Sequence, residues 1–267
     1  STQSPTRPSR LTGVGFAALL LSASTLASRV LGLVRESVLA WRLGASGATD
    51  AYLAAFWLPD MLNYFLAGGA LSIAFIPPFS RALHEGREEE GWKLFSNIAT
   101  LTTVVLAITT AVCWVWAEPL VRHLYPGFDA SQVATTTRLT RIVLPGPLFF
   151  FWGGLLTATE SARSRFAAAS LSPLIYNVCI ILGGLLLAPW MGVDGFSWGV
   201  LAGAALGPAA TSLWFARRSV RYRPTLDLRS PALRTYYATA LPLLFGVSLL
   251  TVDEWLLRRY GAGLVAG

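Results

Sequence analysis

The 267-residue chain is 54% hydrophobic and only 13% charged, so it is far more apolar than an ordinary soluble domain. This composition indicates a membrane protein. Its formal net charge is +7, which would suggest a nucleic-acid partner if the protein were soluble. The position of the basic residues along the chain therefore decides what that charge means.

Apolar runs that are long enough to cross a bilayer recur along the whole chain. About 20 helical residues, at about 1.5 Å each, span the hydrocarbon core. Such runs predict seven spanning helices, near residues 11–41, 50–78, 94–117, 139–159, 166–188, 193–216 and 236–257. We therefore expect an all-α fold, a polytopic membrane helix bundle of about seven transmembrane helices that forms a single membrane domain over residues 1–267.

The first apolar run has an alternative interpretation. Arg7 and Arg10 precede a stretch that ends in small residues near Ala27, which is the pattern of a signal peptide. The apolar pattern continues past Ala27 to Trp41, however, and this favours a spanning helix.

The basic residues are unevenly divided between the two sides of the predicted bundle. If the N-terminus is cytoplasmic, thirteen lie in inner segments: Arg7, Arg10, Arg81, Arg87, Lys93, Arg163, Arg165, Arg217, Arg218, Arg221, Arg223, Arg229 and Arg234. Five lie in outer segments: Arg42, Arg122, Arg138, Arg258 and Arg259. The positive-inside rule then predicts a cytoplasmic N-terminus, and nucleic acid is not an expected partner. We expect the basic loop 217–234 to lie against anionic lipid headgroups.

The first predicted span contains charged residues within its apolar run, in the stretch SRVLGLVRES at 28–37. In a helix, Arg29 and Arg35 lie about 120° apart and about 9 Å along the axis, with Gly32 halfway between them. This leaves a bare patch flanked by two guanidinium groups, which suits an anion with several oxygens such as a lipid-linked diphosphate. The alternative is that one arginine extends to the headgroups and the other pairs with Glu36, seven residues from Arg29.

The second predicted span carries Asp60 and Asn63, three residues apart and on one helix face. A carboxylate within a span needs a cationic partner, and Arg29 or Arg35 is the obvious candidate. An ion pair that only holds the first two spans together is as reasonable as a role in transport.

The outer loop YPGFDASQ, residues 125–132, combines Pro and Gly turn residues with a hydroxyl-bearing helix start. Ser131 is our candidate for the residue that caps the helix leading into the fourth span.

Proline and glycine residues within the spans favour a packed transporter-like bundle over a simple anchor. Each proline removes a backbone donor and tends to bend its helix, which lipid tolerates where the helix faces other helices or a watery cavity. The prolines are Pro59, Pro77, Pro78, Pro145, Pro147, Pro173, Pro208 and Pro242. Gly199, Gly203 and Gly207 form a smooth stripe that we interpret as a helix-packing surface rather than a dimer interface.

No residue set predicts catalysis, a metal site or a cofactor. There is no nucleophile beside a base, no paired carboxylates in a plausible cleft and no glycine-rich phosphate loop, so a membrane-embedded transferase is a minor alternative. Cys113 and Cys179 fall within predicted spans and have no His or Cys partner at ligand spacing.

The stretches SRVLGLVRES, LGASGATDAYLAAFWLP and ALSIAFIPPFS resemble the MurJ/MviN lipid II flippases, whose superfamily (MOP) also contains multidrug (MATE) and polysaccharide exporters. Further matches follow in order: PGF at 126–128, LTRIVLP at 139–145, RFAAASLSPLIYN at 165–177 and LPLLFGVS at 241–248. The resemblance implies one lobe of a two-lobed transporter of about fourteen helices, with a cationic cavity that binds the lipid-linked diphosphate precursor of peptidoglycan and moves it by alternating access. It also implies a bacterial inner-membrane location, with Arg29 and Arg35 matching cavity arginines and Asp50 matching the family's aspartate.

The resemblance is incomplete in the second span and in length. Asn63 and Tyr64 stand where the family has two arginines, Gly68 where it has a glutamate, and Asp60 is an additional acid. Seven spans are about half of a flippase, so the chain is a fragment, pairs with a second lobe, or is a half-transporter with another use. We expect a flippase or its N-terminal lobe. The alternative is a non-transporting structural subunit that packs with other membrane subunits in a larger complex.

Overall fold

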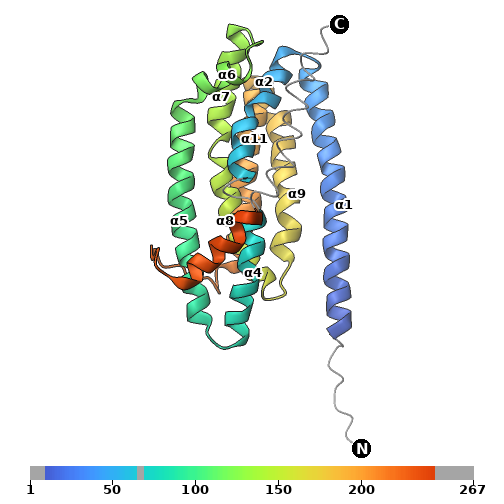
Figure 1. Ribbon diagram of the computed structural model, residues 1–267. Coiled ribbons are helices and arrows are strands. Elements are labelled where there is room, and N and C mark those ends of the chain that lie inside the picture. Colours follow the sequence, from blue (N-terminus) through green and yellow to red (C-terminus); the bar gives the residue numbers. More distant parts are fainter. Residues whose placement is uncertain (1–9, 65–68, 244–267) are drawn as a thin grey trace, which may run out of the picture.

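The computed structural model describes residues 10–64 and 69–243, which form a bundle of helices (Figure 1). The first half contains α1 (Arg10–Leu43), α2 (Gly47–Ala55), α3 (Trp57–Leu62), α4 (Gly69–His84), α5 (Glu88–Val115) and α6 (Ala117–Leu124). The second half contains α7 (Ala130–Val143), α8 (Gly146–Ser161), α9 (Ala167–Leu182), η2 (Gly183–Leu187), α10 (Ala188–Met191), α11 (Asp194–Ala204), η3 (Ala205–Thr211), α12 (Ser212–Ala216) and a helix over 231–243. The described ranges contain no strand, and the all-α prediction is confirmed.

Four helical stretches of the described chain are long and apolar enough to cross a membrane: Glu88–Val115, Ala130–Ser161, Ala167–Met191 and Asp194–Ala216. They coincide with the third to sixth predicted spans. The count of seven spans and the cytoplasmic N-terminus stay predictions. Gly68, the part of the seventh predicted span beyond residue 243, and the basic residues Arg7, Arg258 and Arg259 lie outside the described residues.

The second and fourth predicted spans differ in detail from the observed helices. Residues 50–78 form no single described helix, because α2 and α3 are separate and α3 is only six residues long. The fourth helical stretch begins at Ala130, nine residues before the prediction. Asp129 is its cap, and the Ser131 prediction is wrong. The Asp129 carboxylate accepts a hydrogen bond from the backbone N–H of Gln132 at 2.8 Å, and the side-chain oxygen of Gln132 accepts one from the backbone N–H of Asp129 at 3.1 Å.

Two of the prolines within the spans coincide with changes in helix geometry. A turn at Leu144 and Pro145 separates α7 from α8. Pro208 lies within η3, a π-helical segment, and the wider turn accommodates a residue that has no amide hydrogen to donate. By contrast, α4 continues through Pro77 and Pro78, and α9 through Pro173.

The glycine stripe packs against α9, as predicted. A Cβ atom at Gly199 would lie 2.8 Å from the Cys179 carbonyl oxygen, and one at Gly203 would lie 2.9 Å from that of Tyr176. The backbones of α9 and α11 therefore approach more closely than any larger residue would permit.

The buried core consists of two clusters that fix the helices around the candidate site. One gathers aromatic residues of α4 and α5, where Phe79 and Trp92 meet edge to face with ring centroids 5.2 Å apart. The other joins α1, α2, α7 and α11 through Leu39, Tyr52, Leu139 and Phe196. The second cluster holds the C-terminal half of α1 against the bundle.

Candidate functional site

The predicted anion patch lies on α1, which stands at one edge of the bundle and packs mainly on α9 (Figure 1). The hydroxyl of Ser24 donates a hydrogen bond to the carbonyl oxygen of Ser170, so the N-terminal part of the contact is fixed by a polar bond. In a membrane, such bonds between helices supplement van der Waals packing.

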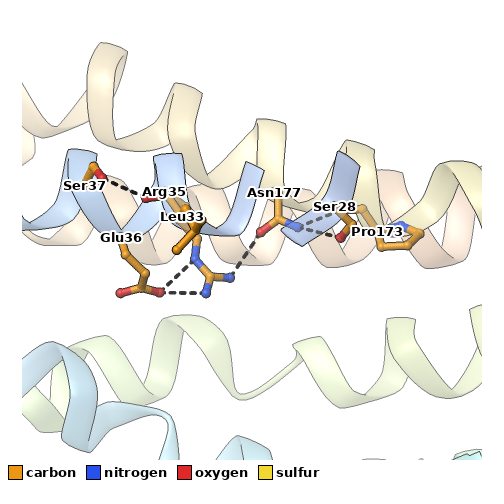
Figure 2. A network of polar contacts seen from close by, with 7 residues as sticks. All are labelled: Ser28, Leu33, Arg35, Glu36, Ser37, Pro173 and Asn177. Carbon is orange, nitrogen blue, oxygen red and sulfur yellow. Dashed lines mark hydrogen bonds and ion pairs between the residues drawn. The ribbon is translucent and has the colours of Figure 1, made fainter. Parts of the chain in front are cut away.

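Asn177 of α9 is the centre of a polar network that joins the two helices (Figure 2). Its amide nitrogen donates hydrogen bonds to the Pro173 carbonyl at 2.9 Å and to the Ser28 hydroxyl at 3.3 Å. Its amide oxygen accepts a hydrogen bond from Arg35 at 3.2 Å. Asn177 is buried, so its polar groups need these partners.

Arg35 is held between a neutral and an acidic partner. Its guanidinium donates to Asn177 on one side, and Nη2 lies 2.7 Å from the Glu36 carboxylate on the other (Figure 2). The side chains of Arg35 and Glu36 are 31% and 58% exposed, so both remain accessible. The alternative in which one arginine pairs with Glu36 therefore holds for Arg35, and not for Arg29. Seven residues separate Arg29 from Glu36 by about 10 Å along the helix, whereas Arg35 is adjacent.

Arg29 and Gly32 form the open part of the patch. Arg29 is exposed and forms no hydrogen bond or ion pair with any described residue. A Cβ atom at Gly32 would meet nothing within 4 Å, so the helix surface between the two arginines is bare. The predicted patch therefore has one arginine fixed by Asn177 and one without a protein partner in the described part of the chain.

Two tyrosines interact electrostatically with Arg35, and one of them also interacts with Asp60. Tyr52 of α2 interacts electrostatically with both Arg35 and Glu36. Tyr176 of α9 interacts electrostatically with both Arg35 of α1 and Asp60 of α3. The ion pair predicted for Asp60 with Arg29 or Arg35 stays a prediction, and Tyr176 is a common electrostatic partner of Asp60 and Arg35.

Asp50 and Asn63 contribute less to this region. Asp50 is exposed in the first turn of α2, where a carboxylate interacts favourably with the helix dipole. Asn63 is half-buried at the end of α3, and its backbone N–H donates to the carbonyl groups of Pro59 and Asp60. Neither side chain is joined to the Arg35 network by a hydrogen bond within the described residues.

Within residues 10–64 and 69–243, no three His, Cys, Asp or Glu residues lie close enough to hold a metal ion. Cys113 and Cys179 are half-buried free thiols. The absence of a metal site and of a cofactor stays a prediction from the sequence.

Comparison with known families identifies the chain. The family model described as lipid II flippase MurJ matches residues 39–256, which is most of the sequence. The chain belongs to the lipid II flippase MurJ family. A probable lipid II flippase MurJ of Bdellovibrio bacteriovorus is 31% identical over 261 residues, and the match covers 94% of this chain and 49% of that protein.

Solved structures show the same fold. A lipid II flippase MurJ in an inward closed conformation matches with a TM-score of 0.75 at 21% identity, over 90% of this chain and 50% of the other. An outward-facing MATE multidrug resistance transporter of the MOP superfamily matches with a TM-score of 0.65 at 16% identity, over 90% and 54%. The chain thus spans about half the length of the MurJ proteins and transporters that it matches. It is a multi-pass membrane protein with the fold of one MurJ lobe.

The match to the MurJ family model begins after the anion patch. Asp50, Asp60 and Asn63 lie within the matched residues, whereas Arg29 and Arg35 precede residue 39. The roles of these arginines in this MurJ-family chain must therefore be argued from their own geometry.

Sequence reasoning assigned no role to Asn177, which orients Arg35. An available signal was an amide side chain within the apolar run LIYNVCIIL, because an uncharged polar residue in a spanning helix commonly bonds to a neighbouring helix.

Proposed function

We propose that this chain forms one lobe of a MurJ-type lipid flippase in a bacterial inner membrane. In this proposal, Arg29, Gly32 and Arg35 bind the diphosphate of a lipid-linked peptidoglycan precursor. In this proposal the protein catalyses no reaction and moves its substrate by alternating access. Because alternating access requires two lobes that move against each other, it acts with a second lobe, from the same or another chain.

The observation that carries the proposal is the open helix surface at Gly32, which lies between Arg35, held by other side chains, and Arg29, which has no partner in the described residues. Asn177 holds Arg35 in place, so less side-chain freedom is lost when Arg35 binds an anion. Arg29 is exposed and has no ion-pair partner in the described residues, so its full charge is available. A diphosphate can span both groups, whereas one phosphate would reach them less well.

A binding measurement with Arg29→Ala tests this function. We expect the affinity of the purified protein for a lipid-linked diphosphate to fall at least about tenfold, because a charge-assisted contact is lost. Arg42→Ala is the matched control: Arg42 is an exposed arginine of the same helix that lies over Trp41, and its removal is expected to change affinity less than about twofold. Unchanged affinity in Arg29→Ala would exclude the proposed role.

A second candidate function is a structural subunit of a larger membrane complex. It is favoured by Asn63 and Tyr64 in the second span and by Glu36, which partly neutralises Arg35. This candidate predicts that the protein copurifies stably with unrelated membrane proteins. A pure preparation that translocates a lipid-linked diphosphate would exclude it.

For the basic loop 217–234 we propose contact with anionic lipid headgroups at the cytoplasmic surface. The loop is held on α5, where the amide of Arg223 donates to Ser96 Oγ at 3.1 Å and that of Asp227 to Asn97 Oδ1 at 3.0 Å. The segment is irregular only as far as residue 230, and Arg234 lies in the first turn of the helix over 231–243. All six of its arginines are exposed, and Asp227 is its one acidic residue. A fixed backbone with outward arginines is what an anionic surface would attract.

A further inference from the structure

A groove of about 660 Å³ opens between α5, α6, α7 and α11, apart from the α1 site. Trp114 and Arg122 lie on its α5–α6 side, Thr137 and Arg141 on α7, and Trp198 on α11. The groove is near the end of the bundle where α6 and the C-terminus of α1 lie (Figure 1). We refer to it as the α7 groove.

The α7 groove contains more positive than negative charge. Arg138 and Asp194 pair through two contacts of 2.8 and 3.1 Å, and Arg122 lies 2.8 Å from Glu118. Arg141 has no carboxylate partner among the described residues. After the two pairs are formed, one arginine charge is left uncompensated within a helix of the membrane domain.

Arg141 is positioned in the groove by Trp114. Its Nε donates to the Trp114 carbonyl at 3.1 Å, and its guanidinium carbon lies 5.1 Å from the centroid of the indole ring. Neither terminal guanidinium nitrogen bonds to a described residue, so both can donate to an anion. An oriented guanidinium with free donors is well suited to a phosphate group.

The other residues that line the groove favour a lipid over a free ion. Trp114 and Trp198 are 48% and 43% exposed, and Leu201 lies beside Trp198 on α11, so the groove presents an apolar surface on the outside of the bundle. An apolar chain would cover the exposed indoles, which a free ion cannot do.

From this arrangement we infer that the α7 groove binds an anionic phospholipid. Arg141 holds its phosphate, and one acyl chain packs over Trp198 and Leu201. A phosphodiester with net charge −1 balances the single uncompensated arginine, whereas a zwitterionic headgroup brings its own cation into a groove that already contains three arginines. The inference does not depend on the proposed flippase activity.

Titration of the purified protein in neutral detergent tests this site, with short-chain phosphatidylglycerol as probe. We expect saturable binding that is at least about tenfold stronger than that of phosphatidylcholine with the same chains or of inorganic phosphate. Arg141→Gln should weaken phosphatidylglycerol binding at least about tenfold, and Arg141→Lys should retain part of it. Arg42→Gln is the matched control, because Arg42 also lies over a tryptophan at the same end of the bundle but does not line the α7 groove, and it should change binding less than about twofold.

Ala134→Trp provides a second variant in case Arg141→Gln fails to fold. Ala134 is exposed and lines the groove, so a large side chain there would occupy it without removing charge, and phosphatidylglycerol binding should fall similarly. Equal binding of the two lipids, binding of inorganic phosphate as strong as that of phosphatidylglycerol, or full affinity in a folded Arg141→Gln or Ala134→Trp variant would each overturn the assignment.

Discussion

The two arginines of α1 have the same chemistry but different surroundings, and their surroundings assign their roles. Arg35 is held by Asn177 and Glu36, so it fixes the position of the patch and joins α1 to α9. Arg29 is exposed with no described partner and supplies charge. Removing Arg29 should therefore affect binding more than stability, whereas disturbing Arg35 or Asn177 should affect both.

Asn177→Ala is expected to loosen the contact between α1 and α9. The substitution removes hydrogen bonds to Ser28 and Arg35 at a buried position, and such a loss costs about 1–3 kcal/mol. The thermal midpoint of unfolding in detergent should fall. Ser37→Ala is the control, because the Ser37 hydroxyl bonds only to the Leu33 carbonyl of its own helix, and it should cost less than about 0.5 kcal/mol. Equal stability of Asn177→Ala and Ser37→Ala would contradict the role of the network.

At the scale of elements, the bundle depends on the close approach of α9 and α11. Gly199 and Gly203 face backbone atoms of α9, and the sequence predicted this packing because their four-residue spacing places them on one helix face. Pro208 shares the region and is accommodated by the π-helical segment η3. The close packing of α9 and α11 therefore depends on glycine residues, which have no side chain, at the contact.

Gly199→Ala should destabilise the protein by about 2 kcal/mol or more, because the new methyl group would overlap with the Cys179 carbonyl and the Gly183 Cα. Gly32→Ala is a matched substitution in a helix where the new methyl group meets nothing, and it should be neutral or slightly stabilising. Unfolding midpoints of the two variants in the same detergent measure the difference. A Gly199→Ala variant as stable as Gly32→Ala would rule out the close packing of α9 and α11.

The sequence predicted the helices better than their ends. The third to sixth spans were placed correctly because their apolar runs are long, but α7 begins in the polar stretch ASQVATTTR, which has no apolar signal. Its start depends on the Asp129 capping box, in which the residue three positions after the cap, Gln132, matters as much as the cap itself. The break between α2 and α3 likewise has no clear signal in an apolar run.

At the scale of the whole molecule, the positive-inside rule predicts which end of the bundle is cytoplasmic. The loop 125–132 and the basic loop 217–234 lie at opposite ends of the bundle (Figure 1). Three helical stretches that are long enough to cross a membrane lie between them in the sequence: Ala130–Ser161, Ala167–Met191 and Asp194–Ala216. The site is harder to predict at this scale. The pattern of Arg29, Gly32 and Arg35 is local to one helix, whereas the contact of Arg35 with Asn177 depends on how α1 and α9 pack.

Cysteine labelling in intact cells tests the topology. In a background with Cys113 and Cys179 replaced by Ala, Gly127→Cys should react with a membrane-impermeant maleimide, since Gly127 is exposed and a Cβ there meets nothing. Ser230→Cys, in the basic loop, should react only after the cells are permeabilised. Labelling of Ser230→Cys in intact cells, with Gly127→Cys protected, would show the opposite orientation.

The most direct test of the anion patch compares two lipids that share one polyprenyl tail and differ by one phosphate. Arg29 and Arg35 flank Gly32 about 9 Å apart along the helix, so a diphosphate can contact both and a monophosphate only one. We predict that the purified protein binds the polyprenyl diphosphate at least about tenfold more tightly than the monophosphate, and that Arg29→Ala abolishes this preference. Equal affinity for the two lipids would show that the tail, and not the patch, is recognised, and would contradict the proposed function.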